Sequence, residues 1–105
     1  MIKCGTDIVR IERLDTINPA IRARFIRRVF TPRELAQAGT ESEALAGLFA
    51  AKEAVSKALG TGIGKVSWQS IEIIHAQSGE PALHLHDEAL KAALARGLTE
   101  WAVSI

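Results

Sequence analysis

Hydrophobic residues between positions 42 and 59 recur at the spacing of an α-helix. Leu48, Ala51, Val55 and Leu59 fall on one face of a 3.6-residue period, which predicts an amphipathic helix packed against a core. The segment Thr40–Glu43 has the Ser/Thr-x-x-Glu pattern of a capping box. We therefore expect a central helix that opens at this box and runs to about Leu59.

A second face of this helix is polar and lightly covered. Glu53 and Lys57 lie one turn apart beside Ala46 and Ala50, so a polar ligand could approach both charges closely. The run Gly60–Gly64 follows, and glycine leaves backbone N–H groups unobstructed by side chains. The alternative interpretation is a surface ion pair, worth about 0.3–0.5 kcal/mol, followed by a glycine C-cap.

The pattern elsewhere predicts further helices and strands around this helix. Asn18 before Pro19 is a typical helix start. Thr31 and Glu34 have the pattern of a capping box at the start of another helix. No repeat or linker interrupts the chain, so we expect one α+β domain of residues 1–105. One helix is expected to start at Asn18, a second to run from Thr31 to Gly39 and a third from Asp87 to Gly97. A helical turn is expected at 10–14. The expected strands are 1–9, 65–75, 81–86 and 98–105.

The composition is that of an ordinary globular protein. The chain has 105 residues, 48% hydrophobic and 24% charged, which excludes the disordered and fibrous classes. A core of this size is modest, and oligomerisation would help to stabilise it. Cys4 is the single cysteine, and there is neither a signal-peptide pattern nor an apolar run of about 20 residues. These features predict a cytoplasmic protein without a membrane partner.

Arginine is concentrated in one third of the chain. Between residues 8 and 33 there are seven arginines against Glu12 and Asp15, although the net charge of the whole chain is only +1. Four of them lie between residues 22 and 28 on a predicted amphipathic helix that contains no acidic residue. Such a face indicates a polyanionic partner, although many such faces are only solvated. The polyanion could be an acidic protein, a nucleic acid or a phosphorylated ligand. Because few aromatic residues accompany the arginines, we expect no nucleic acid.

The chain contains the residue types that phosphoryl chemistry at a divalent metal requires. Asp7 and Glu53 could supply carboxylates, Lys57 a cation for phosphate, and Gly60–Gly64 backbone donors. Asp7 joins the other two only if the first segment packs beside the central helix. The glycine run is not a Walker A motif. His84 and His86 share a strand face but lack the further ligands of a zinc site, so we interpret them as structural.

Three motifs together resemble holo-[acyl-carrier-protein] synthase, the small trimeric group of the 4′-phosphopantetheinyl transferases. They are Gly5-Thr-Asp7-Ile-Val, then Phe49-Ala-Ala-Lys52-Glu53-Ala-Val-Ser-Lys57-Ala-Leu-Gly60-Thr-Gly-Ile-Gly64, and finally Gly79-Glu-Pro81. The central motif is long, the order and spacing of the others agree with it, and the resemblance covers residues 1–105. It implies a small antiparallel sheet packed against a long central helix.

The resemblance also implies a reaction. It is the magnesium-dependent transfer of 4′-phosphopantetheine from coenzyme A to a serine of apo acyl carrier protein, with release of adenosine 3′,5′-bisphosphate. By position, Asp7 and Glu53 are the metal ligands, Lys57 meets the coenzyme A phosphates, and Glu53 acting through a metal-bound water is the expected base. The nucleotide is expected at Gly60, Thr61, Gly62, Gly64 and Pro81, and the acidic carrier protein at Arg13, Arg22, Arg24, Arg27 and Arg28. The family's active sites lie between the protomers of a homotrimer.

Two departures from the family pattern stand beside this resemblance. Leu48 occupies a position where many members carry an arginine, which removes the charge expected for one phosphate contact. The family also continues beyond the segment equivalent to 101–105 with a Ser-His motif and a closing strand, so that the last strand of this chain is expected to be truncated. The alternative hypothesis is accordingly a shortened relative that binds acyl carrier protein or coenzyme A without turnover.

Overall fold

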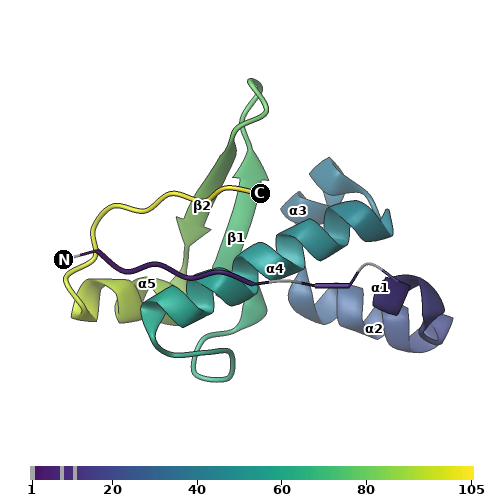
Figure 1. Cartoon of the computed structure of the whole chain (residues 1–105), viewed down its shortest axis with the longest axis horizontal. Helices are drawn as coiled ribbons and strands as arrows, with labels where there is room; N and C mark the ends of the chain where they lie inside the picture. The colour runs from purple at the N-terminus through teal and green to yellow at the C-terminus, as the bar shows by residue number, and fades with distance from the viewer. Residues whose placement is uncertain (1, 8, 11) are drawn as a thin grey trace.

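The computed structural model describes residues 2–7, 9–10 and 12–105 and shows an α+β fold built on one long helix (Figure 1). Two antiparallel strands pair in register from Ile71 opposite Leu85 to His75 opposite Pro81. This confirms the expected fold class, a small antiparallel sheet packed against a long central helix. The elements are α1 (Glu12–Thr16), α2 (Pro19–Val29), α3 (Pro32–Ala38), α4 (Ser42–Leu59), the 3₁₀ turn η1 (Trp68–Ser70), β1 (Ile71–His75), β2 (Pro81–Leu85) and α5 (Asp87–Ala95).

Helix α4 crosses the middle of the molecule and contributes to both parts of the core (Figure 1). Leu45, Leu48 and Ala51 are buried with residues of α1, α2 and β1 and with Phe30, which follows α2. Leu59, further along the same helix, is buried with residues of β1, β2 and α5. The expected apolar face of the central helix is confirmed, because apolar residues at a helical period reach both clusters of the core.

Some of the predicted helix caps are confirmed and two are wrong. The Asn18 side chain accepts a hydrogen bond from the Ala20 amide, and the capping box of Thr31 and Glu34 has both of its bonds. The second box, Thr40–Glu43, does not form, because the N-cap position of α4 is Glu41 rather than Thr40, and Glu41 makes no side-chain cap. The Ser42 hydroxyl donates to Asp15. Asp87 is not a cap either; it is the first helical residue of α5, with a φ of 46°, after His86.

The two terminal strands predicted from the sequence are also wrong for the residues that the structure describes. Residues 2–7, 9 and 98–105 lie outside any strand. The outer edge of β1 has no room for another strand, because side chains already bond its backbone. Glu34 accepts from the Ile73 amide, and Gln37 both accepts from and donates to the backbone of His75. Side chains therefore satisfy the groups that a neighbouring strand would have paired.

The terminal segments pack against helices and the sheet by other contacts. The first residues run along α4 (Figure 1), and the Trp101 indole of the last segment donates to the Leu83 carbonyl at 3.1 Å. The strand predicted at 65–75 begins only at Ile71, since residues 68–70 form the turn η1. None of the helices in the described part of the chain combines the length and hydrophobicity needed to cross a bilayer.

Candidate functional site

The candidate site lies where the first segment of the chain crosses α4, and a glycine makes the crossing possible. A β-carbon at Gly5 would overlap the carbonyl oxygen of Ala54 and lie 3.0 Å from the Ala58 amide nitrogen. Glycine therefore lets the two backbones touch. The approach carries the next residues to Lys57, whose Nζ donates to the Asp7 carboxylate at 2.8 Å and to the Thr6 carbonyl at 3.2 Å.

The electrostatics of the site link all three of the charged residues predicted for it. The hydrogen bond with Asp7 is the main reason why the pKa of Lys57 is raised; slight burial opposes the rise, and the charges of Asp7 and Glu53 add to it. The Lys57 side chain remains 54% exposed, whereas that of Asp7 is 18% exposed. Lys57 therefore pairs with Asp7 rather than forming the simple i,i+4 ion pair with Glu53 that spacing alone suggested.

Small residues surround this crossing and leave space beside it. A hollow of about 360 Å³ is lined by Asp7 and its neighbours in the first segment, by the last two residues of the chain and by Gly47, Ala50 and Ala54 on α4. The expected open face of the central helix is thus present around Ala50. Ala46, which was expected on the same face, is instead buried in the core.

The donor set suits a magnesium ion that retains ligands from water or substrate. The described residues contain no group of three or more His, Cys, Asp or Glu side chains that could hold a metal by themselves. Magnesium is commonly bound by one or two carboxylates together with waters and substrate phosphates, rather than by a closed protein cage. Asp7 and Glu53, both within electrostatic range of Lys57, match that pattern.

The glycine-rich loop after α4 differs from its expected form. Gly60 is a left-handed C-cap, and the N–H groups of Gly60, Thr61 and Gly62 donate to the last carbonyls of the helix. The Gly64 N–H donates to the Val66 carbonyl. The four amides are therefore occupied within the chain, and the expectation that they are free donors for a nucleotide is wrong. The helix-cap interpretation of Gly60 is correct.

Other features of the loop still permit a ligand to approach. The space beside Gly62 and Gly64 is open, and both have positive φ angles. The Thr61 hydroxyl is buried and has no hydrogen-bond partner in the described part of the chain. Pro81 begins β2 at the hairpin end, which projects away from α4 (Figure 1). Within one chain, therefore, Pro81 does not join Asp7 and Lys57.

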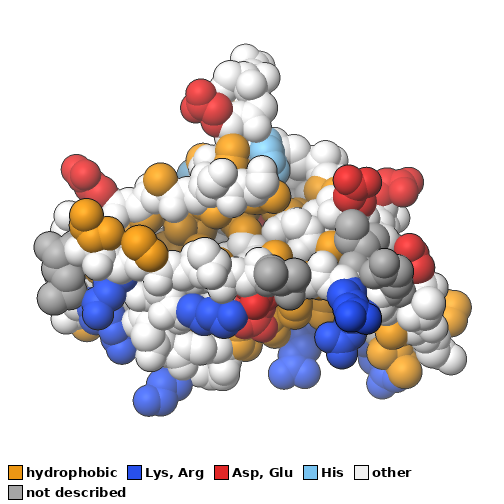
Figure 2. Space-filling view, in the orientation of Figure 1, with side chains coloured by type: hydrophobic (Ala, Val, Ile, Leu, Met, Phe, Trp, Pro, Cys, Tyr) orange, Lys and Arg blue, Asp and Glu red, His pale blue; other side chains and the backbone are white. Residues whose placement is uncertain are grey.

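The arginines predicted to bind a partner fall into two groups. Arg13, Arg24, Arg27 and Arg28 are exposed, and Lys and Arg side chains gather in the lower half of Figure 2. Arg22 is different, because its guanidinium donates to the Thr40 carbonyl at 2.7 Å and to the Ser42 hydroxyl at 3.2 Å. One guanidinium nitrogen makes both bonds and ties α2 to the start of α4, so Arg22 has a structural side-chain contact that the other four arginines lack within the described part of the chain. Its role in partner binding stays a prediction.

An apolar groove accompanies the exposed arginines. Its volume is about 290 Å³, and Arg13 lines it together with Leu14, Ile21, Phe25 and Phe49. The neighbouring helix end is held in place by an amide from elsewhere in the chain. Gln69 donates to the carbonyls of residues 27 and 30 at the end of α2.

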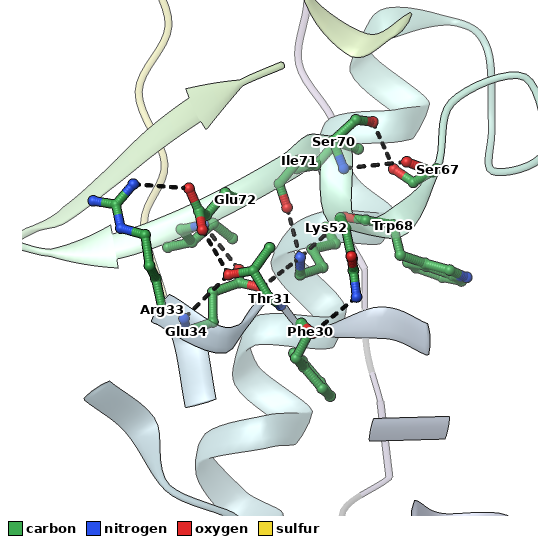
Figure 3. Close-up of polar contacts among 12 residues, drawn as sticks. Phe30, Thr31, Arg33, Glu34, Lys52, Ser67, Trp68, Ser70, Ile71 and Glu72 are labelled. Carbon is green, nitrogen blue, oxygen red and sulfur yellow. Dashed lines mark hydrogen bonds and ion pairs between the residues drawn. The ribbon is translucent and has the colours of Figure 1, made fainter. Parts of the chain in front are cut away.

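Sequence reasoning missed a buried network of charges behind the site (Figure 3). The Lys52 ammonium lies 2.8 Å from the Glu34 carboxylate, and neither side chain has any exposed surface. Burial is the main influence on Lys52 and lowers its pKa, while the hydrogen bond and charge of Glu34 oppose this. A signal was present in the sequence, because position 52 lies four residues after Leu48 on the inner face of the predicted helix.

The network continues to the surface through a second carboxylate. Glu72 accepts from the Thr31 hydroxyl at 2.6 Å and contacts Arg33 and His86, each at 3.1 Å. Burial by itself would raise the pKa of Glu72, but the hydrogen bonds from Thr31 and His86 and the charge of Arg33 outweigh it and lower the pKa. His86 therefore has a structural contact here, as expected for a histidine outside any metal site.

Comparisons with known proteins agree with this architecture. The model of the 4′-phosphopantetheinyl transferase superfamily matches residues 3–105. A holo-[acyl-carrier-protein] synthase of Natranaerobius thermophilus is 42% identical over 108 residues, which cover 100% of this chain and 86% of that protein. The crystal structure of holo-[acyl-carrier-protein] synthase from Neisseria meningitidis is 40% identical, with a TM-score of 0.81 over 94% of this chain and 83% of that one.

A third relative has been solved with a ligand. The Helicobacter pylori holo-[acyl-carrier-protein] synthase in complex with coenzyme A is 35% identical, with a TM-score of 0.76 over 84% of this chain and 77% of that one. The sequence match and the shared fold extend over nearly the whole chain. The chain therefore belongs to the 4′-phosphopantetheinyl transferase superfamily, as an enzyme of the holo-[acyl-carrier-protein] synthase kind.

Proposed function

We propose that this protein, as one domain of residues 1–105, transfers 4′-phosphopantetheine from coenzyme A to a serine of apo acyl carrier protein and releases adenosine 3′,5′-bisphosphate. The observation that carries the proposal is the contact of Asp7 with Lys57, one turn beyond Glu53 on α4. Two carboxylates and a cation beside open space are the groups that displacement at a phosphate requires. The relative from Helicobacter pylori binds coenzyme A, which supports the same co-substrate here.

Asp7 and Glu53 would hold Mg²⁺, whose bound charge offsets the negative charge that develops on the leaving phosphate. Lys57, which has unused donor capacity at its exposed end, contacts a phosphate of coenzyme A and orients it. Glu53 accepts the proton of the serine hydroxyl through a water molecule. The hollow between the first segment and Ala50 and Ala54 would receive the part of the co-substrate next to the metal.

The remaining contacts to coenzyme A involve the loop after α4 and the hairpin. The loop has no side chains at Gly60, Gly62 and Gly64, so the nucleotide can pack directly against its backbone. The amides of these residues are already bonded within the chain and do not donate to it. Thr61 supplies a hydroxyl without a partner among the described residues. Pro81 is remote from Lys57 within one chain, and a homotrimer with sites between protomers would place a neighbour's hairpin at the same nucleotide.

The carrier protein docks on the exposed arginines and the apolar groove beside them. Acyl carrier protein is acidic, so it is attracted and oriented by the positive charges of Arg13, Arg24, Arg27 and Arg28. We place this encounter in the cytoplasm. Phe25 and Phe49 line the groove and can bury an apolar side chain of the partner. Phe49 of the groove and Glu53 of the metal site are both residues of α4, so this helix contributes to the two surfaces that the carrier protein and its serine would occupy.

The variant Glu53→Gln tests the proposed site, because it removes one charge at nearly constant volume. We expect the transfer rate to fall by at least about 100-fold, while the melting temperature stays the same. Glu43→Gln makes the same chemical change at an exposed position of α4 and is the control. Transfer by Glu53→Gln at the rate of the control would contradict the role of Glu53. A wild-type chain that binds coenzyme A and carrier protein without transfer would support a binding-only relative instead.

A further inference from the structure

Lys52 is a fully buried cation immediately before Glu53 in the chain. An ion pair that is buried on both sides gives up the hydration of two charges, and well-packed apolar residues of the same size are often as stable or more stable. Stability alone therefore gives little reason for a lysine here. The surroundings of the ammonium indicate a different role.

The Lys52 ammonium is held by acceptors from three separate elements. It lies 2.8 Å from the Glu34 carboxylate of α3, 3.0 Å from the Trp68 carbonyl of η1 and 2.6 Å from the Ile71 carbonyl of β1 (Figure 3). A lysine ammonium has three protons, and each has an acceptor here. Because the acceptors surround one atom, Nζ cannot move toward one without leaving another.

The acceptors are themselves fixed. Glu34 accepts a hydrogen bond from the Thr31 amide with one oxygen and from the Ile73 amide with the other, both at 2.9 Å. The turn that presents the Trp68 and Ile71 carbonyls is closed by two bonds between Ser67 and Ser70. The anchor of Lys52 is therefore part of the sheet and of α3, and it moves only if they move.

This anchor sets the rotation of α4. Successive residues of a helix are about 100° apart around its axis, so the residue after Lys52 is directed to a defined side. One turn on, the buried Ser56 hydroxyl donates to the Glu53 carbonyl at 2.7 Å and holds the same stretch of backbone. A turn of α4 about its axis would break the Lys52 contacts and carry Glu53 and Lys57 away from Asp7.

We propose that Lys52 is a positioning residue of the transferase, which fixes the rotation of α4 so that Glu53 and Lys57 face Asp7. Glu34 is its fixed counterpart. The inference rests on the proposed function, because that function makes Glu53 and Lys57 site residues. The effect of Lys52 on the rotation of α4 does not depend on turnover. Lys52 itself touches neither substrate nor metal in this account.

The double variant Lys52→Met with Glu34→Gln separates positioning from stability. It removes both buried charges at nearly constant volume, so no unpaired charge remains and the chain is expected to fold. We expect the Mg²⁺ concentration for half-maximal coenzyme A binding, measured by calorimetry, to rise about 10-fold or more, and kcat to fall about 10- to 100-fold. The Michaelis constant for carrier protein is expected to change less than about 2-fold, because the arginines of α2 are untouched.

The control is Lys91→Met with Glu88→Gln, which removes an exposed ion pair of α5 and should change none of these quantities. A folded Lys52→Met/Glu34→Gln variant with wild-type Mg²⁺ dependence and kcat would overturn the proposal. If this variant does not fold, Lys52→Arg takes its place, because the charge remains but the longer, planar group cannot reach the same three acceptors. Wild-type values for Lys52→Arg would overturn the proposal equally. Coenzyme A binding is measured without turnover, so a failure of the transferase proposal can be distinguished from a failure of the positioning proposal.

Discussion

At the scale of single residues, the ion pair of Lys57 with Asp7 depends on a glycine two positions before the aspartate. The paired residues are 50 positions apart in the chain, and Gly5 is where the backbones come into contact. The spacing of Glu53 and Lys57 could be read from the sequence because it is local. The approach of Asp7 could not, since it depends on the path of the first segment across α4.

Gly5→Ala tests whether this crossing assembles the site. The new β-carbon would overlap the Ala54 carbonyl and force the first segment away from α4. We expect the Mg²⁺ requirement of the transfer reaction to rise at least about 10-fold, with little change in melting temperature. Cys4→Ala changes the exposed neighbouring residue and is the control. An unchanged Mg²⁺ requirement in Gly5→Ala would show that the close approach is not needed.

The lowered pKa of Glu72 predicts that the free energy of unfolding depends on pH. Its pKa is lowered in the folded protein, so its stabilising effect is complete above the ordinary value of 4.5 and is lost as the pH falls through the lower folded pKa. Glu72→Gln is expected to be less stable at pH 7 by about 1–3 kcal/mol, since Thr31 and Arg33 lose a charged acceptor. The difference from wild type should shrink below pH 4.5, as urea unfolding across pH would show. An equal difference at every pH would contradict this role.

At the scale of elements, α2 has two functions that its sequence does not separate. Arg22 and its arginine neighbours look alike in a row of basic residues, but Arg22 bonds the Thr40 carbonyl and Ser42, whereas Arg24 and Arg28 are exposed. The capping box predicted at 40–43 fails for a related reason, because α4 begins at Ser42 with Glu41 at the N-cap position, one residue later than the pattern indicates. A capping pattern identifies residues that can cap, whereas tertiary contacts decide whether they do.

Charge reversal on α2 should therefore affect docking, and loss of Arg22 should affect stability. Arg24→Glu with Arg28→Glu is expected to raise the Michaelis constant for carrier protein at least about 10-fold and to leave that for coenzyme A nearly unchanged. Arg22→Met is expected to cost about 1 kcal/mol in unfolding free energy. Steady-state kinetics with each substrate and chemical denaturation measure these effects. Equal changes in both Michaelis constants for the double variant would contradict a docking surface.

At the scale of the whole molecule, the sequence predicted the fold class, the central helix, the hairpin and the start of α2 and α3. These elements depend on local periodicity, caps and turn residues. The terminal segments were predicted as strands from their β-branched content, but a strand also needs a free edge to pair with. Here Glu34, Gln37 and Lys52 already bond the outer edge of β1, from positions that no local pattern relates to that strand.

The same long-range contacts join the core to the candidate site. Lys52 connects α4 to α3 and β1 on its inner face, and the next residue carries a carboxylate whose charge acts on Lys57. Lys52 and Glu53 are adjacent in the sequence, and only the structure separates a buried anchor from a site residue. The fold therefore holds the charges of α4 and the first segment in one place.

The transferase activity is most directly tested by mass spectrometry of apo acyl carrier protein after incubation with this chain, coenzyme A and Mg²⁺. We expect that the carrier protein gains one phosphopantetheine group, that adenosine 3′,5′-bisphosphate appears in equal amount, and that chelation of Mg²⁺ prevents both. A carrier protein of unchanged mass, in the presence of a folded chain that still binds coenzyme A, would contradict the account.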